Sequence, residues 1–117
     1  PPFEVLLFGR PLSAPADVFG PDEPGILTVD RLRAALAVDG AIEAVPIGSS
    51  GVAAEFEALA RTSGGRAHMT DDWPCDRGQS GGPSTAALLE VAPERLAAAL
   101  AALPVLGCPA WHLGRVV

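Results

Sequence analysis

The sequence contains no lysine, asparagine or tyrosine, and it has only two histidines, two cysteines and one methionine. All eight basic residues are arginine, and they face 14 acidic residues, so the formal net charge at pH 7 is −6. A negative surface repels a phosphate backbone, which argues against a nucleic-acid partner. No apolar run approaches the roughly 18 residues that a membrane span needs, so we expect no membrane segment.

The opening segment "PPFEVLLFGR" lacks the basic region and cleavage site of a signal peptide, and we expect a cytoplasmic protein. In that compartment Cys75 and Cys108 are free thiols, whereas an oxidising compartment would allow a disulfide between them. The chain has 117 residues, 49% of them hydrophobic, which is enough for one domain with its own core. We therefore treat residues 1–117 as a single domain.

Strand-like and helix-like apolar patterns alternate along the chain. Strands are predicted at 3–9, 41–47, 66–70, 85–91 and 108–117, and helices from Thr28 to Gly40, between Gly51 and Gly64, and from Pro93 through Leu103. Residues 1–27 form a strand and a Pro-rich loop that lead into the body, residues 28–117. The fold class predicted is α+β, with an antiparallel or mixed sheet of four to five strands and two to three helices packed mainly on one face.

The first helix carries an apolar stripe at Val29, Leu32 and Leu36, the spacing of residues on one helical face. In the second helix, Val52, Phe56 and Leu59 follow the same rule. These stripes are the faces that we expect each helix to bury.

Two Gly- and Ser-containing turns are the candidate binding segments. The first is "GSSG", with Gly48, Ser49, Ser50 and Gly51 at the start of the second helix, where unpaired amides and a partial positive charge favour phosphate. The alternative is a simple helix cap without a ligand. The second turn lies in "DRGQSGGPS", residues 76–84, and its candidate phosphate-binding residues are Arg77, Ser80, Gly81, Gly82 and Ser84.

The letters "GQSGGP" also resemble the nucleophile loop of trypsin-like serine proteases. That chemistry needs a Ser, a His and an Asp on two β-barrels, which take roughly twice this length. We therefore interpret the segment as a flexible loop with free amides and assign no catalytic residue.

Metal-ligand side chains occur in two sets. The first set has the ligand types of zinc: His68, Cys75, Cys108 and His112. The second set could hold a hard cation through its carboxylates: Asp71, Asp72 and Asp76. The zinc-type residues lack standard spacing, and the aspartates are typical of a solvated loop. No metal site is predicted.

The C-terminal third, "GPSTAALLEVAPERLAAALAALPVLGCPAWHLGRVV", resembles the end of the aminoimidazole-ribonucleotide-synthetase-like superfamily. That superfamily includes phosphoribosylformylglycinamidine synthase of purine biosynthesis, selenophosphate synthetase and thiamine-monophosphate kinase. The family pattern is a Gly/Ser loop, an apolar strand, "V-x-P-E", a helix, a small-residue turn and a strand ending in "IG-x-V". Upstream, "GAIEAVPIGSSGVAAEFEALARTSGGRAHM" is similar to the family's strand, Gly-rich turn, helix and strand.

The resemblance implies a C-terminal-type domain of an ATP-dependent phosphotransferase or synthetase. In the family, an N-terminal half supplies most ligands of ATP and Mg²⁺ and much of the dimer interface, so a partner half or a homo-oligomer is implied. The sequence departs from the family pattern at the Gly-rich turn, where Pro46 and Ser49 stand in place of an acidic residue.

We therefore expect a domain that is not catalytic alone, carries no cofactor of its own, and binds a phosphate-bearing small molecule. The alternative is a structural or self-association module.

Overall fold

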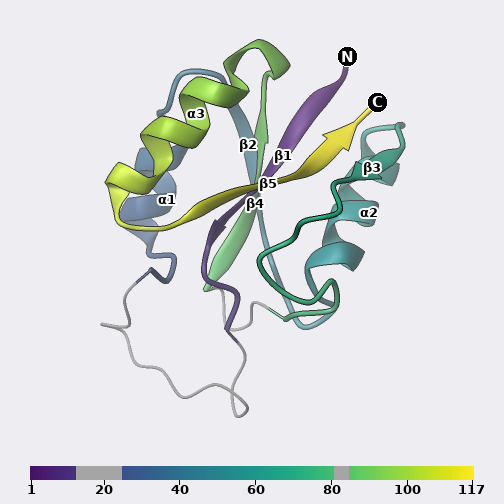
Figure 1. Cartoon of the computed structure of the whole chain (residues 1–117), viewed down its shortest axis with the longest axis horizontal. Helices are drawn as coiled ribbons and strands as arrows, with labels where there is room; N and C mark the ends of the chain where they lie inside the picture. The colour runs from purple at the N-terminus through teal and green to yellow at the C-terminus, as the bar shows by residue number, and fades with distance from the viewer. Residues whose placement is uncertain (13–24, 81–84) are drawn as a thin grey trace.

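The structure is a computed structural model, and it describes residues 1–12, 25–80 and 85–117 (Figure 1). Within these ranges, one antiparallel sheet runs in the order β2-β4-β1-β5-β3. The strands are β1 (Phe3–Gly9), β2 (Ala41–Pro46), β3 (Ala67–Met69), β4 (Ala86–Val91) and β5 (Ala110–Val116). The helices are α1 (Val29–Leu36), α2 (Val52–Thr62) and α3 (Leu96–Ala102), with short 3₁₀ turns η1 (Pro93–Arg95) and η2 (Leu103–Leu106) around α3.

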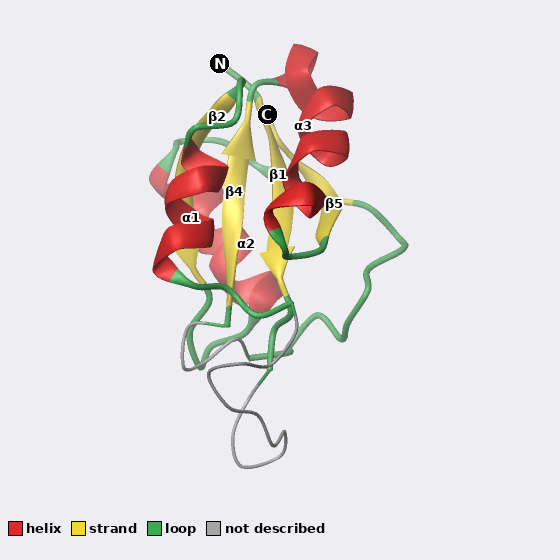
Figure 2. Cartoon of the chain, turned by 90° about the vertical axis from the view of Figure 1, so that its left-hand side faces the viewer, coloured by secondary structure: helices red, strands yellow, loops and turns green. Residues whose placement is uncertain are grey.

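The helices lie on both faces of the sheet. Helices α1 and α3 share one face, and α2 covers the other (Figure 2). The predicted α+β class is therefore confirmed, with two of these three helices on a common face. Each predicted strand and helix is found at its expected place in the chain.

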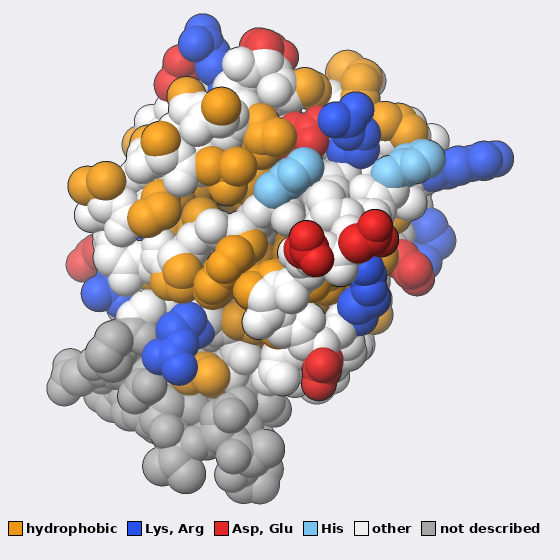
Figure 3. Space-filling model, viewed as in Figure 1, with side chains coloured by type: hydrophobic (Ala, Val, Ile, Leu, Met, Phe, Trp, Pro, Cys, Tyr) orange, Lys and Arg blue, Asp and Glu red, His pale blue; other side chains and the backbone are white. Residues whose placement is uncertain are grey.

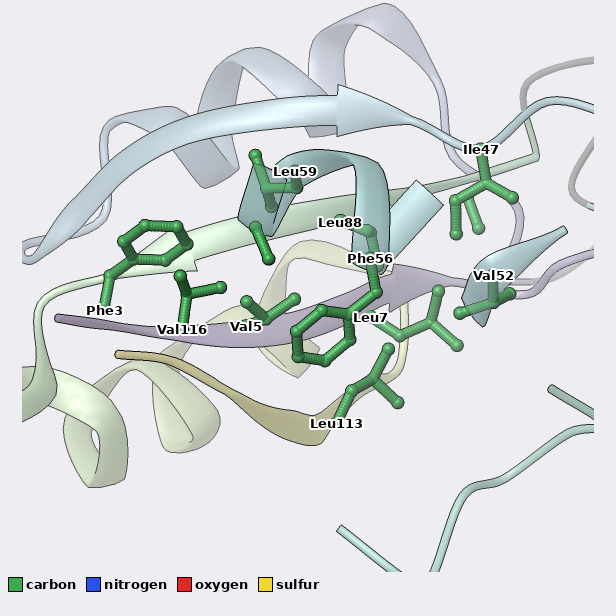
Figure 4. Close-up of a cluster of buried hydrophobic side chains, with 12 residues drawn as sticks. Phe3, Val5, Leu7, Ile47, Val52, Phe56, Leu59, Leu88, Leu113 and Val116 are labelled. Atoms are coloured by element: carbon green, nitrogen blue, oxygen red, sulfur yellow. The ribbon is translucent and has the colours of Figure 1, made fainter. Parts of the chain in front are cut away.

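Strand β1 lies at the centre of the sheet, and all seven of its residues are buried. Because successive side chains of a strand point to opposite faces, it contributes to two cores. Phe3, Val5 and Leu7 pack under α2 with Phe56 and Leu113 (Figure 4). Leu6 and Phe8 pack under α1 and α3 with Leu89, Val91 and Leu103. Burying side chains of this size stabilises a fold by about 1.5–3 kcal/mol each.

Glu4 is the polar exception on β1. Its carboxylate is 3% exposed, and it accepts a hydrogen bond from His112 Nε2 at 2.8 Å. Arg115 Nε lies 3.5 Å from the other carboxylate oxygen. Both partners come from the neighbouring strand β5, so this buried charge is matched within the β1–β5 pair, and removing either partner would leave it uncompensated.

Helix α1 does not bury the stripe predicted to face the core. Val29 is 71% exposed and Leu36 is 43% exposed, while the buried residue of α1 is Ala35. The reason is close packing, because a small residue lets the helix approach the sheet. The stripe is displaced towards the outer edge of β2, where Val29 and Leu32 line a hollow with Pro46. On the face shown in Figure 3, hydrophobic side chains also gather on the side where α3 lies.

Gly114 gives a sharp test of the β3–β5 pairing. Its φ is +152°, and a Cβ there would collide with the backbone carbonyl oxygen of His68 and lie 2.9 Å from Met69 Cα. We expect Gly114→Ala to lower the free energy of unfolding by about 2–4 kcal/mol, because neither backbone can move without breaking the strand pair.

The matched control is Gly64→Ala, where φ is +76° but an added Cβ would meet nothing within 4 Å. That change should cost only about 1 kcal/mol. Urea denaturation measures both, and equal losses would contradict the packing at Gly114.

Candidate functional site

The two predicted binding turns meet at one end of the sheet. Strands β2 and β4 are antiparallel, with Pro46 opposite Ala87, so the end of β2 lies beside the start of β4. The Ile47 N–H donates to the Ala86 carbonyl at 3.1 Å, which extends the pairing past Pro46. The chain that follows β2 and the chain that precedes β4 therefore run together.

A close backbone contact joins the turns. Gly51 has φ +96°, and a Cβ at this position would lie 2.6 Å from the Gly78 carbonyl oxygen. The Ser80 hydroxyl donates to the Gly48 carbonyl oxygen at 3.2 Å. Only glycine combines this φ with so close an approach, which gives Gly51 a structural role.

The first amides of α2 are already hydrogen-bonded. Val52 N–H donates to the Gln79 carbonyl at 3.0 Å, and Ala53 N–H donates to the Arg77 carbonyl at 2.8 Å. Gly51, the N-cap, makes no side-chain cap bond, so carbonyls from the second turn cap the helix instead. The expectation that this helix start presents bare amides is wrong for Val52 and Ala53, because the second turn occupies the place that an anion would take.

The side chain of Arg77, from the second turn, already has partners in the segment that precedes the turn. Its guanidinium lies 4.3 Å from the ring centroid of Trp73, and it donates to the Thr70 carbonyl at 2.8 Å and to Met69 Sδ at 3.0 Å. Trp73 in turn stacks on Phe56 and donates to the Leu113 carbonyl. Arg77 therefore ties the loop to the core, and its remaining capacity for phosphate is reduced.

The exposed part of the site is the first turn. Ser49 and Ser50 are exposed, and their hydroxyls make no hydrogen bond within the part of the chain that the structure describes. Next to the second turn, Arg10, Cys75, Gln79 and Trp111 line a cavity of about 340 Å³. Gly81, Gly82 and Ser84, also predicted to bind phosphate, lie outside the described residues.

The other reactive side chains do not form a centre. Both cysteines are free, and burial raises the pKa of each thiol, Cys75 and Cys108, which disfavours the reactive thiolate. Cys108 donates to the Ile26 carbonyl, and His112 is held by Glu4. No hydrogen bond joins Ser80 to either histidine among the described residues.

No group of three His, Cys, Asp or Glu side chains in the described ranges is arranged to hold a metal ion. The exposed donors at the joined turns are the hydroxyls of Ser49 and Ser50, and a carboxylate also lies there, since Glu55 Oε1 would be 3.8 Å from a Cβ at Gly48. One carboxylate beside the turns is not the grouped ligand set that the Mg²⁺ and ATP chemistry of the parent enzymes requires, so these residues do not fit that chemistry.

A carboxyl pair on the α2 face of the sheet escaped the sequence analysis. Glu43 of β2 stands opposite Glu90 of β4, and the two carboxyl groups share a hydrogen bond. Burial, then the hydrogen bond and the charge of Glu43, raise the pKa of Glu90 to about 7. Each glutamate interrupts an apolar strand, which was the available signal, but their pairing depends on a strand order that the sequence does not display.

No protein-family model matches this sequence, and neither a curated protein nor a solved structure matches it significantly. No helix in the described ranges is both long and apolar enough to cross a membrane. The family resemblance therefore stays a prediction that rests on the sequence motifs alone.

The shared proton of the carboxyl pair makes stability depend on pH. Because the pKa of Glu90 is about 7 in the folded protein and 4.5 in the reference state, the native state binds the extra proton between these values. Stability should therefore fall as pH rises from about 4.5 to about 7, by up to about 3 kcal/mol.

Glu90→Gln removes the titration and should raise the free energy of unfolding at pH 8 relative to the unmodified chain, with little difference at pH 5. Glu57→Gln, an exposed glutamate on α2, is the control and should leave the pH profile unchanged. Denaturant melts across this pH range provide the measurement, and a Glu90→Gln profile parallel to that of the unmodified chain would contradict the shared proton.

Proposed function

We propose that this chain is a non-catalytic domain that binds a phosphate-bearing small molecule at the joined turns, as a C-terminal-type unit of the aminoimidazole-ribonucleotide-synthetase-like superfamily. The observation that carries the proposal is the convergence of two Gly/Ser turns, Gly48–Gly51 and Gly78–Ser80, at the start of α2. The sequence motifs support the family in this proposal, and the convergence of the turns supports the position proposed for the ligand.

Ser49 and Ser50 are the donors that support binding. Both hydroxyls are exposed next to the N-terminal end of an 11-residue helix, where the backbone dipoles favour an anion. The amides of Val52 and Ala53 take no part, since they are bonded to the second turn. Because the donors are two hydroxyl groups and we assign no basic side chain to the ligand, inorganic phosphate alone should bind weakly. A larger phosphate ester should bind more tightly, because it can make additional contacts.

Thermal denaturation with added phosphate, ATP or a ribonucleotide tests the site. A ligand that binds only the folded chain raises the melting temperature, by an increment that grows with ligand concentration. We expect such a rise for the unmodified chain and its loss in Ser50→Glu, because the new carboxylate repels phosphate.

Ser63→Glu is the matched control, since Ser63 is an exposed serine at the opposite, C-terminal end of α2. It should keep the ligand effect. No rise with any of these ligands, or an equal loss in both variants, would overturn the proposal.

A second candidate function, self-association, has its own support. Strand β2 is an edge strand of the sheet in the described part of the chain, and Ile42 on it is 57% exposed. On the other face of the sheet, α1 also leaves Val29 and Leu36 exposed, and Val29 lines a hollow with Pro46 of β2. An edge strand beside exposed apolar side chains is suited to pairing with a second copy about a two-fold axis.

Sedimentation velocity from about 10 μM to about 1 mM separates this candidate from a monomeric domain, because association by mass action depends on concentration. Self-association through this edge predicts a rising average mass that Ile42→Asp removes. Val105→Asp, at a site on η2 that is 84% exposed, should not affect it. A constant monomer mass would exclude the candidate.

A further inference from the structure

A cavity of about 590 Å³ opens on the α2 face of the sheet, at the opposite end of α2 from the joined turns. Its walls are mainly apolar, with Phe3, Ile42 and Pro93 among them, and Ser63 marks the C-terminal end of α2. This volume is within the range of small-molecule sites, and apolar walls with a few polar groups are typical of them.

The polar groups of this cavity are acidic. Glu90 and Glu94 line it, and Glu43 is hydrogen-bonded to Glu90. Among the residues that the structure describes, the lining includes no arginine or histidine side chain. The charge of the cavity is therefore not balanced by a basic side chain of its own wall.

Glu90 carries an unmet hydrogen-bonding requirement. The residue is only 5% exposed, and apart from the proton that the carboxyl group shares with Glu43, its buried Oε2 atom has no hydrogen-bond donor among the described residues. A buried polar atom of this kind costs about 1–3 kcal/mol, and native structures usually provide a partner for it. Rotation about the bond to the carboxyl carbon exchanges the two oxygens, so a donor in the cavity can reach either one.

We propose that this cavity binds a small organic ammonium ion, a primary amine on a short apolar body, with the ammonium group held by Glu90, which is paired with Glu43 behind it, and the body against Phe3, Ile42 and Pro93. An ammonium group brings three donors and one positive charge, which suits two adjacent carboxyl groups. A neutral alcohol offers one donor and no charge, and a carboxylate is repelled.

Proton release accompanies binding. Without a ligand, the carboxyl pair is about half protonated at pH 7, since the pKa of Glu90 is about 7. The bound ammonium ion replaces the pair's proton, which is released to the solvent. The affinity for the amine should therefore rise with pH through this range. The other charged side chain that lines the cavity is Glu94, from η1.

The probes are 2-phenylethylamine, 2-phenylethanol and phenylacetate, which share one apolar body and differ in charge. Titration followed by amide NMR shifts should give the amine a dissociation constant on the order of 1 mM at pH 8, a value suited to so small a ligand. The alcohol and the acid should bind at least about tenfold more weakly. At pH 5.5 the amine should lose about tenfold in affinity, because the pair is then protonated.

Glu90→Gln keeps the shape of the side chain and should remove the preference for the amine. Glu57→Gln, which removes the same charge from a residue lining a different cavity, should leave it unchanged. Calorimetry in two buffers of different ionisation enthalpy should detect proton release with the unmodified chain near pH 7.

Equal binding of amine and alcohol would overturn the proposal, since the cavity would then be a merely apolar site. Equal loss of amine binding in Glu57→Gln would also overturn it, because the attraction would be a general effect of net charge. If Glu90→Gln does not fold, the three probes on the unmodified chain still decide the question.

Discussion

Burial of β1 on both faces is the constraint from which the rest of the architecture follows. Its seven residues lie between β4 and β5, so each face of the strand must be covered by a separate layer. Helix α2 covers one face, and α1 with α3 covers the other. Burial on both faces explains why the seven residues of β1 are uncharged except for Glu4. It also explains why the Glu4 carboxylate has two partners, His112 and Arg115.

The same sheet positions the candidate site. Antiparallel pairing of β2 with β4 brings the turn after β2 beside the segment before β4, and the approach of Gly51 to Gly78 locks them together. This close approach has a chemical consequence, because the carbonyls of Arg77 and Gln79 then accept hydrogen bonds from the first amides of α2. What the joined turns offer a ligand is consequently a pair of serine hydroxyls at a helix start, a weaker donor set than a bare helix N-terminus.

Local patterns were sufficient to predict the elements, and long-range pairing decided where the predictions failed. Alternation and Gly or Pro boundaries located β1, α2 and β4, because those signals are short-range. The stripe of Val29 and Leu36 failed as a core face, since the sheet selected the small Ala35 for close approach. For the same reason Arg77 could not be assigned from sequence, because its stacking on Trp73 depends on the folded loop. The pairing of Glu43 with Glu90 likewise needs the strand order.

The most direct test of the account is amide NMR of the joined turns during titration with inorganic phosphate. We predict that Val52 and Ala53 are protected from hydrogen exchange before phosphate is added and stay protected afterwards, while the amide shifts of Ser49 and Ser50 move with phosphate concentration. Rapid exchange of Val52 and Ala53, or phosphate-induced shifts at those two amides with none at Ser49 and Ser50, would contradict it.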